Sequence, residues 1–417
     1  MSPFTRRSFV RVAGASAAVA FLPVSLRAQS ASGRVVVVGG GFGGATAAKY
    51  LRLWSPDVRV TLVEPNPTYH SCVMSNLYYP GRVSLDFLET PYDGLVSRGV
   101  EMVRDRAVAI DVDAHTVTLG RGGVLSYDKL VVAPGIDFIF PPGLEDPAAR
   151  QRVPHAWTNV AEQAPLLRSR LRGMPDGGTF VLTVPPVPYR CPPGPYERAC
   201  MVASYLRRAK RRSKVVVLDA NPDIVAKREI FHHAFDVTHR GFVEYHPNAP
   251  VLRVDPDTLT VTTAIGSFRA GALNVIPPQR AGRIAADAGL VNVDDRWAGV
   301  DPQTFGSTAA PDVFIVGDSN GSNVGKSGHF ANSEGKLVAS AIGAQLAGER
   351  ENPSPILGNV CFSAISLSTA SSFTNHMTYR GGTMVTIPES VAESPPSTDN
   401  FELMFGWGRN LWADSLR

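Results

Sequence analysis

The chain has 417 residues, of which 44% are hydrophobic and 19% charged. It is therefore long enough to bury more than one core, and two or three domains are expected. The formal charge of +4 matches four arginines among residues 1–30, a stretch without an acidic residue, so the remainder is neutral. A neutral body gives no reason to expect nucleic acid or an acidic membrane surface as a partner.

The basic N-terminus has the pattern of an export signal. Arg6 and Arg7 form a twin-arginine motif, and a mildly apolar segment (12–24) and a stretch of small residues (27–32) follow it. The apolar segment is too short to span a bilayer, and no other long apolar run occurs. We expect a twin-arginine signal peptide over residues 1–31 and a periplasmic location, where disulfides are allowed. A disordered basic tail is the alternative.

A glycine-rich turn follows the first apolar strand. Residues 35–38 are four valines, typical of a strand that is buried on both faces. Gly39, Gly41 and Gly44 then show the spacing G-x-G-x-x-G, which permits a tight turn, close approach of a pyrophosphate and helix packing on the strand. Residues 45–51 are predicted to be a helix whose N-terminus faces that phosphate.

An acidic residue completes this motif. The next predicted strand, 58–64, ends on Glu64, twenty residues after Gly44, where the ribose hydroxyls of a dinucleotide lie. A chance glycine-rich turn would not also supply the strand, the helix and the acid. The sequence therefore predicts a dinucleotide-binding domain.

Two later stretches indicate which dinucleotide binds. Residues 127–135 form a strand that runs into a turn at Ala133 and Gly135, and residues 312–318 form a strand that ends on Gly317 and Asp318. In FAD enzymes with two dinucleotide-type domains, such strands return to the first sheet, and the aspartate accepts a hydrogen bond from the ribityl chain. A simple NAD domain has no use for the late strand. We therefore predict FAD, with the N-terminus of a helix over 328–346 near the flavin.

The middle of the chain has the layout of a second nucleotide domain without its chemistry. Strands are predicted at 179–184 and 214–219, with a helix at 196–211 between them. Prolines dominate residues 185–195, where an NAD-binding domain places glycines. Proline has no N–H to offer a phosphate, so we do not expect NAD(P)H as the reductant.

The four cysteines are Cys72, Cys191, Cys200 and Cys361. None lies in a haem-attachment motif or has the paired spacing of a zinc site. Four cysteines allow three pairings, and two structural disulfides are one interpretation. Cys191 lies immediately before a predicted helix N-terminus, a position that stabilises a thiolate and so indicates chemistry.

The cysteine segments carry a resemblance to a known family. Residues 69–72 (Tyr-His-Ser-Cys), the proline-rich segment 189–200 and the late Cys361 make the chain resemble, over essentially its whole length, the flavoprotein subunit of flavocytochrome c sulfide dehydrogenase. The resemblance implies that Cys72 holds FAD covalently through the 8α-methyl group, and that Cys191 and Cys361 form a redox-active disulfide beside the flavin ring. It also implies that the electron acceptor is a c-type cytochrome subunit, which alone carries the haem.

The predicted fold is α/β, with two Rossmann-like dinucleotide-binding domains of the disulfide-reductase type and a small C-terminal α+β sheet domain. The expected boundaries are 32–152 with 281–351 for the FAD-binding domain, 153–280 for the second domain and 352–417 for the C-terminal domain. A hairpin turn is expected at 380–383. The aromatic segment 401–412 is expected to pack against the core or the flavin, with a membrane-surface contact as the alternative.

The predicted activity is sulfide oxidation, in which hydrosulfide attacks the disulfide and Glu197, one helical turn from the cysteine segment, moves the proton. The alternatives are a sulfide:quinone oxidoreductase and a non-catalytic redox subunit of a sulfur-oxidising complex. No metal site is expected. The predicted catalytic residues are Cys191, Cys361 and Glu197. The predicted cofactor-binding residues are Gly39, Gly41, Phe42, Gly43, Gly44, Glu64, Cys72, Val108, Ala133, Gly135, Gly317, Asp318 and Phe330.

Overall fold

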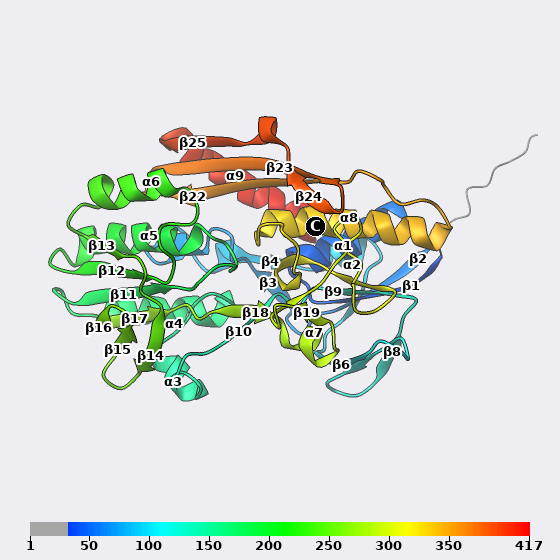
Figure 1. Ribbon diagram of the computed structural model, residues 1–417, viewed down its shortest axis with the longest axis horizontal. Helices are drawn as coiled ribbons and strands as arrows, with labels where there is room; N and C mark the ends of the chain where they lie inside the picture. The colour runs from blue at the N-terminus through cyan, green and yellow to red at the C-terminus, as the bar shows by residue number, and fades with distance from the viewer. Residues whose placement is uncertain (1–31) are drawn as a thin grey trace, which may run out of the picture.

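The computed structural model describes residues 32–417, so the predicted export signal lies outside the described residues. Its first sheet has five parallel strands, β21-β9-β1-β2-β5, and the valine run forms the central strand (Figure 1). Branched apolar side chains suit this place because both faces of the sheet are covered. The strands are β1 (Gly33–Val38), β2 (Val58–Val63), β5 (Glu101–Val103), β9 (Lys129–Val132) and β21 (Val313–Ile315).

The late strand joins this sheet as predicted. β21 pairs parallel with β9, with Phe314 opposite Val131. The chain therefore leaves the first sheet after β9 and returns to it about 180 residues later. That return brings the Gly317–Asp318 turn to the same edge of the sheet as the glycine turn after β1.

Two helices cross closely beside the first sheet. α1 (Phe42–Trp54) begins three residues before the predicted start, and α8 (Gly328–Ala347) matches the prediction within one residue. A Cβ atom on Gly335 of α8 would lie only 2.5 Å from the carbonyl oxygen of Gly43 and 2.9 Å from the Thr46 side chain. Glycine at 335 is therefore what lets the two helices approach.

The second sheet is also parallel, in the order β13-β12-β11-β17. α5 (Gly194–Ala209) follows β11 after the proline-rich turn and packs on this sheet, as the second-domain pattern predicts. The second-domain elements are β11 (Thr179–Val184), β12 (Lys214–Asp219), β13 (Val243–His246), β17 (Ala272–Val275) and α4 (Val160–Gly173).

The C-terminal region is an antiparallel sheet with one long helix. β23 (Ala370–Arg380) pairs with β22 (Ile356–Ala364), β24 (Thr383–Thr386) and β25 (Ala392–Ser397). The hairpin predicted at 380–383 is confirmed, and its Gly381 and Gly382 both have positive φ, 60° and 85°. The aromatic segment lies in α9 (Thr398–Leu416), where Phe401 and Trp412 are buried, so packing against the core is confirmed.

Smaller elements complete the fold. β10 (Ile136–Phe138) pairs antiparallel with β18 (Gln279–Ala281), and these strands connect the two parallel sheets. The others are β3 (Thr68–His70), β4 (Glu89–Pro91), β6 (Ala107–Asp111), β7 (Thr116–Leu119), β8 (Val124–Ser126), β14 (Val251–Asp255), β15 (Thr260–Thr263), β16 (Gly266–Arg269), β19 (Val291–Val293), β20 (Trp297–Ala298), α2 (Asp93–Ser97), α3 (Pro147–Arg152), α6 (Arg228–His233) and α7 (Arg283–Asp287).

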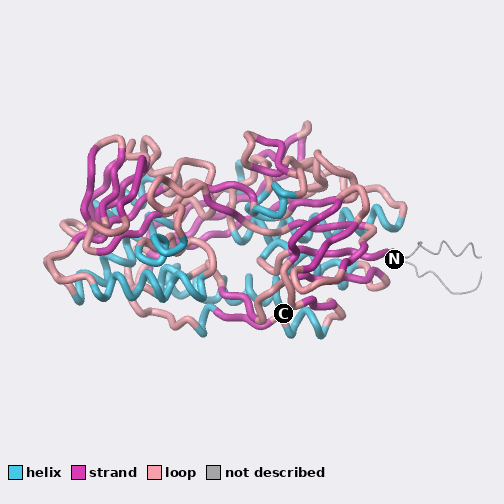
Figure 2. The backbone as a smooth tube through the Cα atoms, turned by 90° about the horizontal axis from the view of Figure 1, so that it is seen from below, coloured by secondary structure: helices cyan, strands magenta, loops and turns pink. Residues whose placement is uncertain are grey.

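The molecule is elongated, with the two parallel-sheet halves side by side (Figure 2). The C-terminal sheet lies across both halves, over α5 and α6 at one end and α8 at the other (Figure 1). The predicted α/β class with two dinucleotide-type sheets and a C-terminal sheet is confirmed. Within residues 32–417, no helix combines the length and apolar character needed to cross a membrane.

The contact between α1 and α8 predicts the effect of two glycine substitutions. Gly335→Ala forces a methyl group against the α1 backbone, so the free energy of unfolding should fall by about 1–3 kcal/mol. Gly406→Ala, inside α9 with open space around it, should instead be neutral or raise stability by up to about 1 kcal/mol. Thermal unfolding of the two variants measures this, and equal melting temperatures would contradict the proposed close contact.

Candidate functional site

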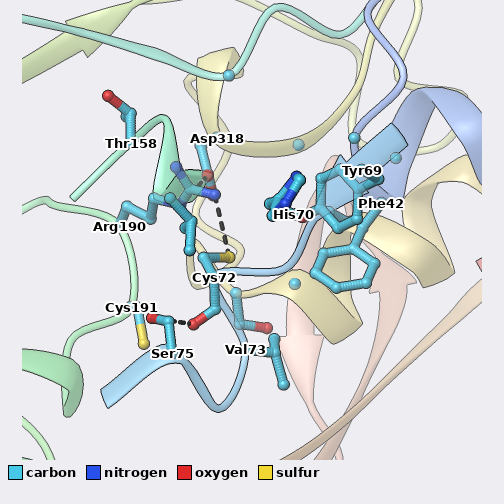
Figure 3. Close-up of a pocket in the computed structure, with 18 of the residues that line it drawn as sticks. Phe42, Tyr69, His70, Cys72, Val73, Ser75, Thr158, Arg190, Cys191 and Asp318 are labelled. Atoms are coloured by element: carbon cyan, nitrogen blue, oxygen red, sulfur yellow. Dashed lines mark hydrogen bonds and ion pairs between the residues drawn. The ribbon is translucent and has the colours of Figure 1, made fainter. Parts of the chain in front are cut away.

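A cavity of about 570 Å³ opens at the carboxyl edge of the first parallel sheet. Its walls come from several parts of the chain, among them the glycine turn, the loop after β2, the proline-rich turn before α5, and the C-terminal sheet. Figure 3 shows side chains from three of these parts facing one another around Cys72. Ligands bind at this edge in open α/β sheets, because the loops there diverge.

The glycine turn leaves one end of the cavity lined with free N–H groups. Gly39 has φ +101°, and a Cβ atom there would lie 2.3 Å from the carbonyl oxygen of Ala133. Gly41 caps α1 without a side-chain acceptor, and nothing lies within 4 Å of the place its Cβ would take. The first turn of α1 therefore presents unpaired donors and open space, which fits a dinucleotide pyrophosphate.

Glu64 lies beside that turn in a fixed orientation. Its carboxylate accepts hydrogen bonds from the Gly40 backbone N–H at 2.9 Å and from the Asn66 side-chain amide at 2.7 Å. Oε1 also accepts from the Asn66 backbone N–H, whereas Oε2 accepts only from Gly40, so Oε2 keeps acceptor capacity toward the cavity that Glu64 lines. This arrangement fits the ribose hydroxyls of a dinucleotide.

The late Gly-Asp turn also lines the cavity. Gly317 has φ +77°, and its N–H donates to the Glu334 carboxylate of α8 at 2.6 Å. Asp318 lines the cavity together with Ala133 and Gly135 from the turn after β9. Three segments far apart in sequence thus meet, and acceptors are available where an FAD ribityl chain would run.

Arg190 is a site residue that sequence reasoning missed. Its guanidinium pairs with Asp318 (Nε to Oδ2, 3.2 Å), donates to the Trp157 carbonyl (3.3 Å) and donates to the Cys72 sulfur (Nη2 to Sγ, 3.1 Å; Figure 3). Burial alone would lower the pKa of Arg190, and the charges of Cys72 and Asp318 more than offset this. The sequence feature that could have indicated Arg190 is that it is the one basic residue in the proline-rich turn 185–195.

Three of the four cysteines line the cavity, namely Cys72, Cys191 and Cys361, whereas Cys200 is buried in the body of α5. All four are free thiols in this structure, so the predicted Cys191–Cys361 pairing stays a prediction. Cys191 has a left-handed backbone (φ 54°), and its N–H donates to the Lys326 carbonyl at 2.7 Å. The proline-rich turn thus folds so that it places Cys191 in the cavity wall.

The expected thiolate stabilisation at Cys191 is wrong for the free thiol. Burial, followed by the negative charges of Cys361 and Glu197, raises the pKa of Cys191 well above its usual range. The nearby helix α5 begins only at Gly194, three residues further on, so its N-terminus does not outweigh this desolvation.

Glu197 lies in the first turn of α5 and lines the cavity. Its carboxylate accepts from the Asn76 side chain at 2.7 Å and from the Ala364 N–H at 2.8 Å. Burial raises its pKa, and these two hydrogen bonds oppose the rise. A carboxyl group shifted upward in this way holds a proton more readily than an exposed one and is a candidate for proton transfer to a neighbouring sulfur.

Lys227 is a second residue that sequence reasoning missed. Its ammonium donates to the Ser371 hydroxyl at 3.0 Å and lies 3.5 Å from the Cys361 carbonyl oxygen. Burial raises the pKa of Cys361, and the Lys227 charge acts in the opposite direction. Lys227 sits in a loop of the second domain with no motif around it, so only the packing of the C-terminal sheet reveals its role.

Three predicted cofactor residues do not line the cavity. Val108 is on β6 of a separate antiparallel sheet, with its side chain turned to solvent (48% exposed). Phe330, the third residue of α8, is 4% exposed, because its side chain packs into the hydrophobic core. Gly44 serves helix packing instead, since a Cβ atom there would lie 2.0 Å from the Gly39 carbonyl oxygen. Within residues 32–417, no cluster of three or more His, Cys, Asp or Glu forms a metal site.

Comparison with known proteins identifies the family. The family model described as the central part of the sulfide dehydrogenase (flavocytochrome c) flavoprotein chain matches residues 164–277, and that of the pyridine nucleotide-disulphide oxidoreductases matches residues 33–163. The flavoprotein chain of sulfide dehydrogenase (flavocytochrome c) from Chlorobaculum thiosulfatiphilum is 63% identical over 43 residues, which are 10% of this chain and 90% of that one. The chain belongs to this flavoprotein family.

The chain is also similar to sulfide:quinone oxidoreductases. The sulfide-quinone reductase of Aquifex aeolicus is 34% identical over 107 residues, and the match spans only 25% of either chain. The solved structure of the sulfide:quinone oxidoreductase from Aquifex aeolicus superposes with a TM-score of 0.76 at 21% identity, over 92% of this chain and 91% of that one. The resemblance inferred from the cysteine segments is confirmed, and the disulfide-reductase-type fold with it.

The buried carboxyl of Glu334 predicts how stability depends on pH. Burial raises the pKa of Glu334 from 4.5 to about 7. The folded chain therefore holds a proton that the unfolded chain has lost, and stability falls as pH rises from about 4.5 to 7, by roughly 3 kcal/mol. Glu334→Gln should remove this fall and be the more stable form at pH 8. Urea unfolding at several pH values measures it, with the exposed Glu402→Gln as control; a Glu334→Gln profile parallel to the parent's would contradict it.

Proposed function

We propose that this chain is the flavoprotein subunit of an exported, periplasmic sulfide dehydrogenase that passes electrons to a c-type cytochrome subunit. In this proposal FAD occupies the cavity and is attached covalently to Cys72. One observation carries the proposal: Cys72, Cys191, Cys361 and Glu197 line the same cavity as the glycine turn. Thiols and a candidate dinucleotide site thus lie in one cavity, and the family relationship supports the proposed function.

The residues present fit FAD. The N–H groups at Gly41 and the start of α1 would hold the pyrophosphate, Glu64 the adenosine ribose, and Asp318 the ribityl chain. The thiols then lie toward the flavin end of the cavity. FAD, when bound, supplies a two-electron acceptor that passes electrons on singly to haem.

Sulfide oxidation would begin at a Cys191–Cys361 disulfide. Hydrosulfide attacks the sulfur of Cys191, the S–S bond breaks, Cys191 carries a persulfide, and Cys361 leaves as a thiolate. The direction of cleavage follows from Lys227, whose buried ammonium lies beside Cys361 and favours negative charge there. The two thiols are inequivalent for this reason.

Glu197 would manage the proton. The Glu197 charge acts on the thiols of both Cys191 and Cys361. Because its pKa is raised, Glu197 can take up the proton of hydrosulfide and return it to a leaving sulfur. A further sulfide removes the outer persulfide sulfur as polysulfide, which leaves both cysteines reduced. Re-formation of the disulfide then gives up two electrons and completes the cycle.

A sulfide:quinone oxidoreductase is the second candidate, since the structure of that class from Aquifex aeolicus matches nearly the whole chain. The two functions differ only in the electron acceptor. A non-catalytic redox subunit is the third interpretation, and it predicts cytochrome binding without sulfide turnover.

The choice of acceptor tests the proposal. The protein purified from its host should oxidise sulfide with cytochrome c as acceptor and should not reduce a short-chain ubiquinone at a comparable rate. Anaerobic assays with each acceptor measure this. Quinone reduction without cytochrome reduction would favour the second candidate, and tight cytochrome binding with no sulfide turnover would favour the third.

Serine variants of the cysteines test the disulfide. Cys191→Ser and Cys361→Ser should each lower sulfide oxidation by about a hundredfold or more while FAD stays bound, because the reacting sulfur is lost. Cys200→Ser, with its thiol buried inside α5, should keep most activity in the folded protein. The measurements are sulfide-dependent flavin bleaching and thermal melting.

A purely structural disulfide would behave differently. Its loss costs roughly 2–5 kcal/mol of stability but leaves activity in the folded fraction. If Cys191→Ser bleaches its flavin as fast as the parent, attack on the disulfide is excluded.

A further inference from the structure

The three nitrogen atoms of the Arg190 guanidinium each have a different partner. Nε pairs with the Asp318 carboxylate, Nη1 donates to the Trp157 carbonyl, and Nη2 donates to the sulfur of Cys72. The side chain is 20% exposed and that of Asp318 13%. The guanidinium is planar and rigid. With Nε and Nη1 held by their partners, the N–H groups of Nη2 point in a fixed direction, toward the Cys72 sulfur.

The backbone around Arg190 fixes this geometry further. The Arg190 N–H donates to the Gln279 side chain at 2.8 Å, and the Arg190 carbonyl accepts from the Trp157 indole at 3.2 Å. Arg190 is therefore immobilised by its main chain as well as by its side chain. Cys72 is likewise fixed from its own side, because its carbonyl accepts from the Ser75 hydroxyl at 2.7 Å (Figure 3).

We propose that Arg190 activates Cys72 as the nucleophile that attaches the flavin, an inference that rests on the proposed covalent FAD. A guanidinium hydrogen-bonded to sulfur stabilises the thiolate, which is the form of cysteine that attacks carbon. Asp318 orients the guanidinium and keeps it in the cavity. The thiol pair of Cys191 and Cys361 is not involved.

Covalent attachment of the flavin to Cys72 is an oxidation of the 8α-methyl carbon by two electrons. A bond forms between the Cys72 sulfur and the carbon of the flavin 8α-methyl group, one C–H bond of that methyl breaks, and its proton goes to solvent. Two electrons are left on the ring system. Dioxygen or the cytochrome acceptor removes them and restores the oxidised cofactor.

The test measures attachment rather than turnover. Full-length parent, Arg190→Gln, Arg190→Lys, Cys72→Ala and the control Arg168→Gln are expressed in one host, and flavin is measured in the pellet and supernatant after acid precipitation. Arg168 lies over the Tyr78 ring, 4.4 Å away, and does not line the cavity. Intact mass reports the bound flavin independently.

We expect pelleted flavin in the parent and in Arg168→Gln, and released flavin in Cys72→Ala. Arg190→Gln should bind FAD reversibly, and its attachment on incubation with FAD in air should be at least about tenfold slower than in the parent, because a hydrogen bond from a charged donor is lost. Arg190→Lys, which keeps the charge without the fork, should be intermediate.

The assay distinguishes a failure of the proposed covalent attachment from a failure of the proposed role of Arg190. If the parent releases its flavin, covalent attachment itself is wrong and the inference falls with it. If the parent retains flavin and Arg190→Gln attaches it at the same rate, the role of Arg190 is wrong and the proposed function stands. If Arg190→Gln does not fold, Arg190→Lys decides: slower attachment than in the parent supports the inference, and an equal rate overturns it.

Discussion

The buried contact of Arg190 with Asp318 and Cys72 joins the parts of the molecule on which the site depends. Asp318 follows β21 of the first sheet, Cys72 lies just after β3, and Arg190 lies in the turn between β11 and α5 of the second domain. A buried guanidinium without partners would cost several kcal/mol, so these segments must meet for the charge to be satisfied. The proline-rich turn, having lost the N–H groups of a nucleotide site, instead positions a cation and a thiol.

A second electrostatic arrangement distinguishes Cys191 from Cys361, the two other thiols that line the cavity. Burial raises the pKa of both Cys191 and Cys361; at Cys361 the Lys227 charge is the main effect that opposes the rise, whereas at Cys191 the charges of Cys361 and Glu197 add to it. Burial strengthens such differences, because charges interact more strongly in the low-dielectric interior than in water. The C-terminal sheet is essential here, since it carries Cys361 and accepts the hydrogen bonds of Lys227 through Ser371.

Local patterns predicted much of the fold. The valine run, the glycine spacing and the Gly317–Asp318 strand end each depend on neighbouring residues, and all three meet at the carboxyl edge of the first sheet as expected. Arg190 and Lys227 depend on contacts across domains, which no short pattern encodes. Val108 and Phe330 do not line the cavity, and the sequence could not show this, because a strand or helix position says little about the direction of one side chain. The pKa of Cys191 depends on desolvation by the whole fold, which outweighs the nearby helix end.

Mass spectrometry of the cysteines after brief exposure to sulfide tests the central claim most directly. The oxidised protein is mixed anaerobically with one equivalent of sulfide, quenched with an alkylating agent and digested. The account predicts an additional sulfur on the Cys191 peptide and an alkylated Cys361. Bleaching of the flavin with Cys191 and Cys361 both unmodified would show that sulfide reacts without the disulfide, and would contradict the account.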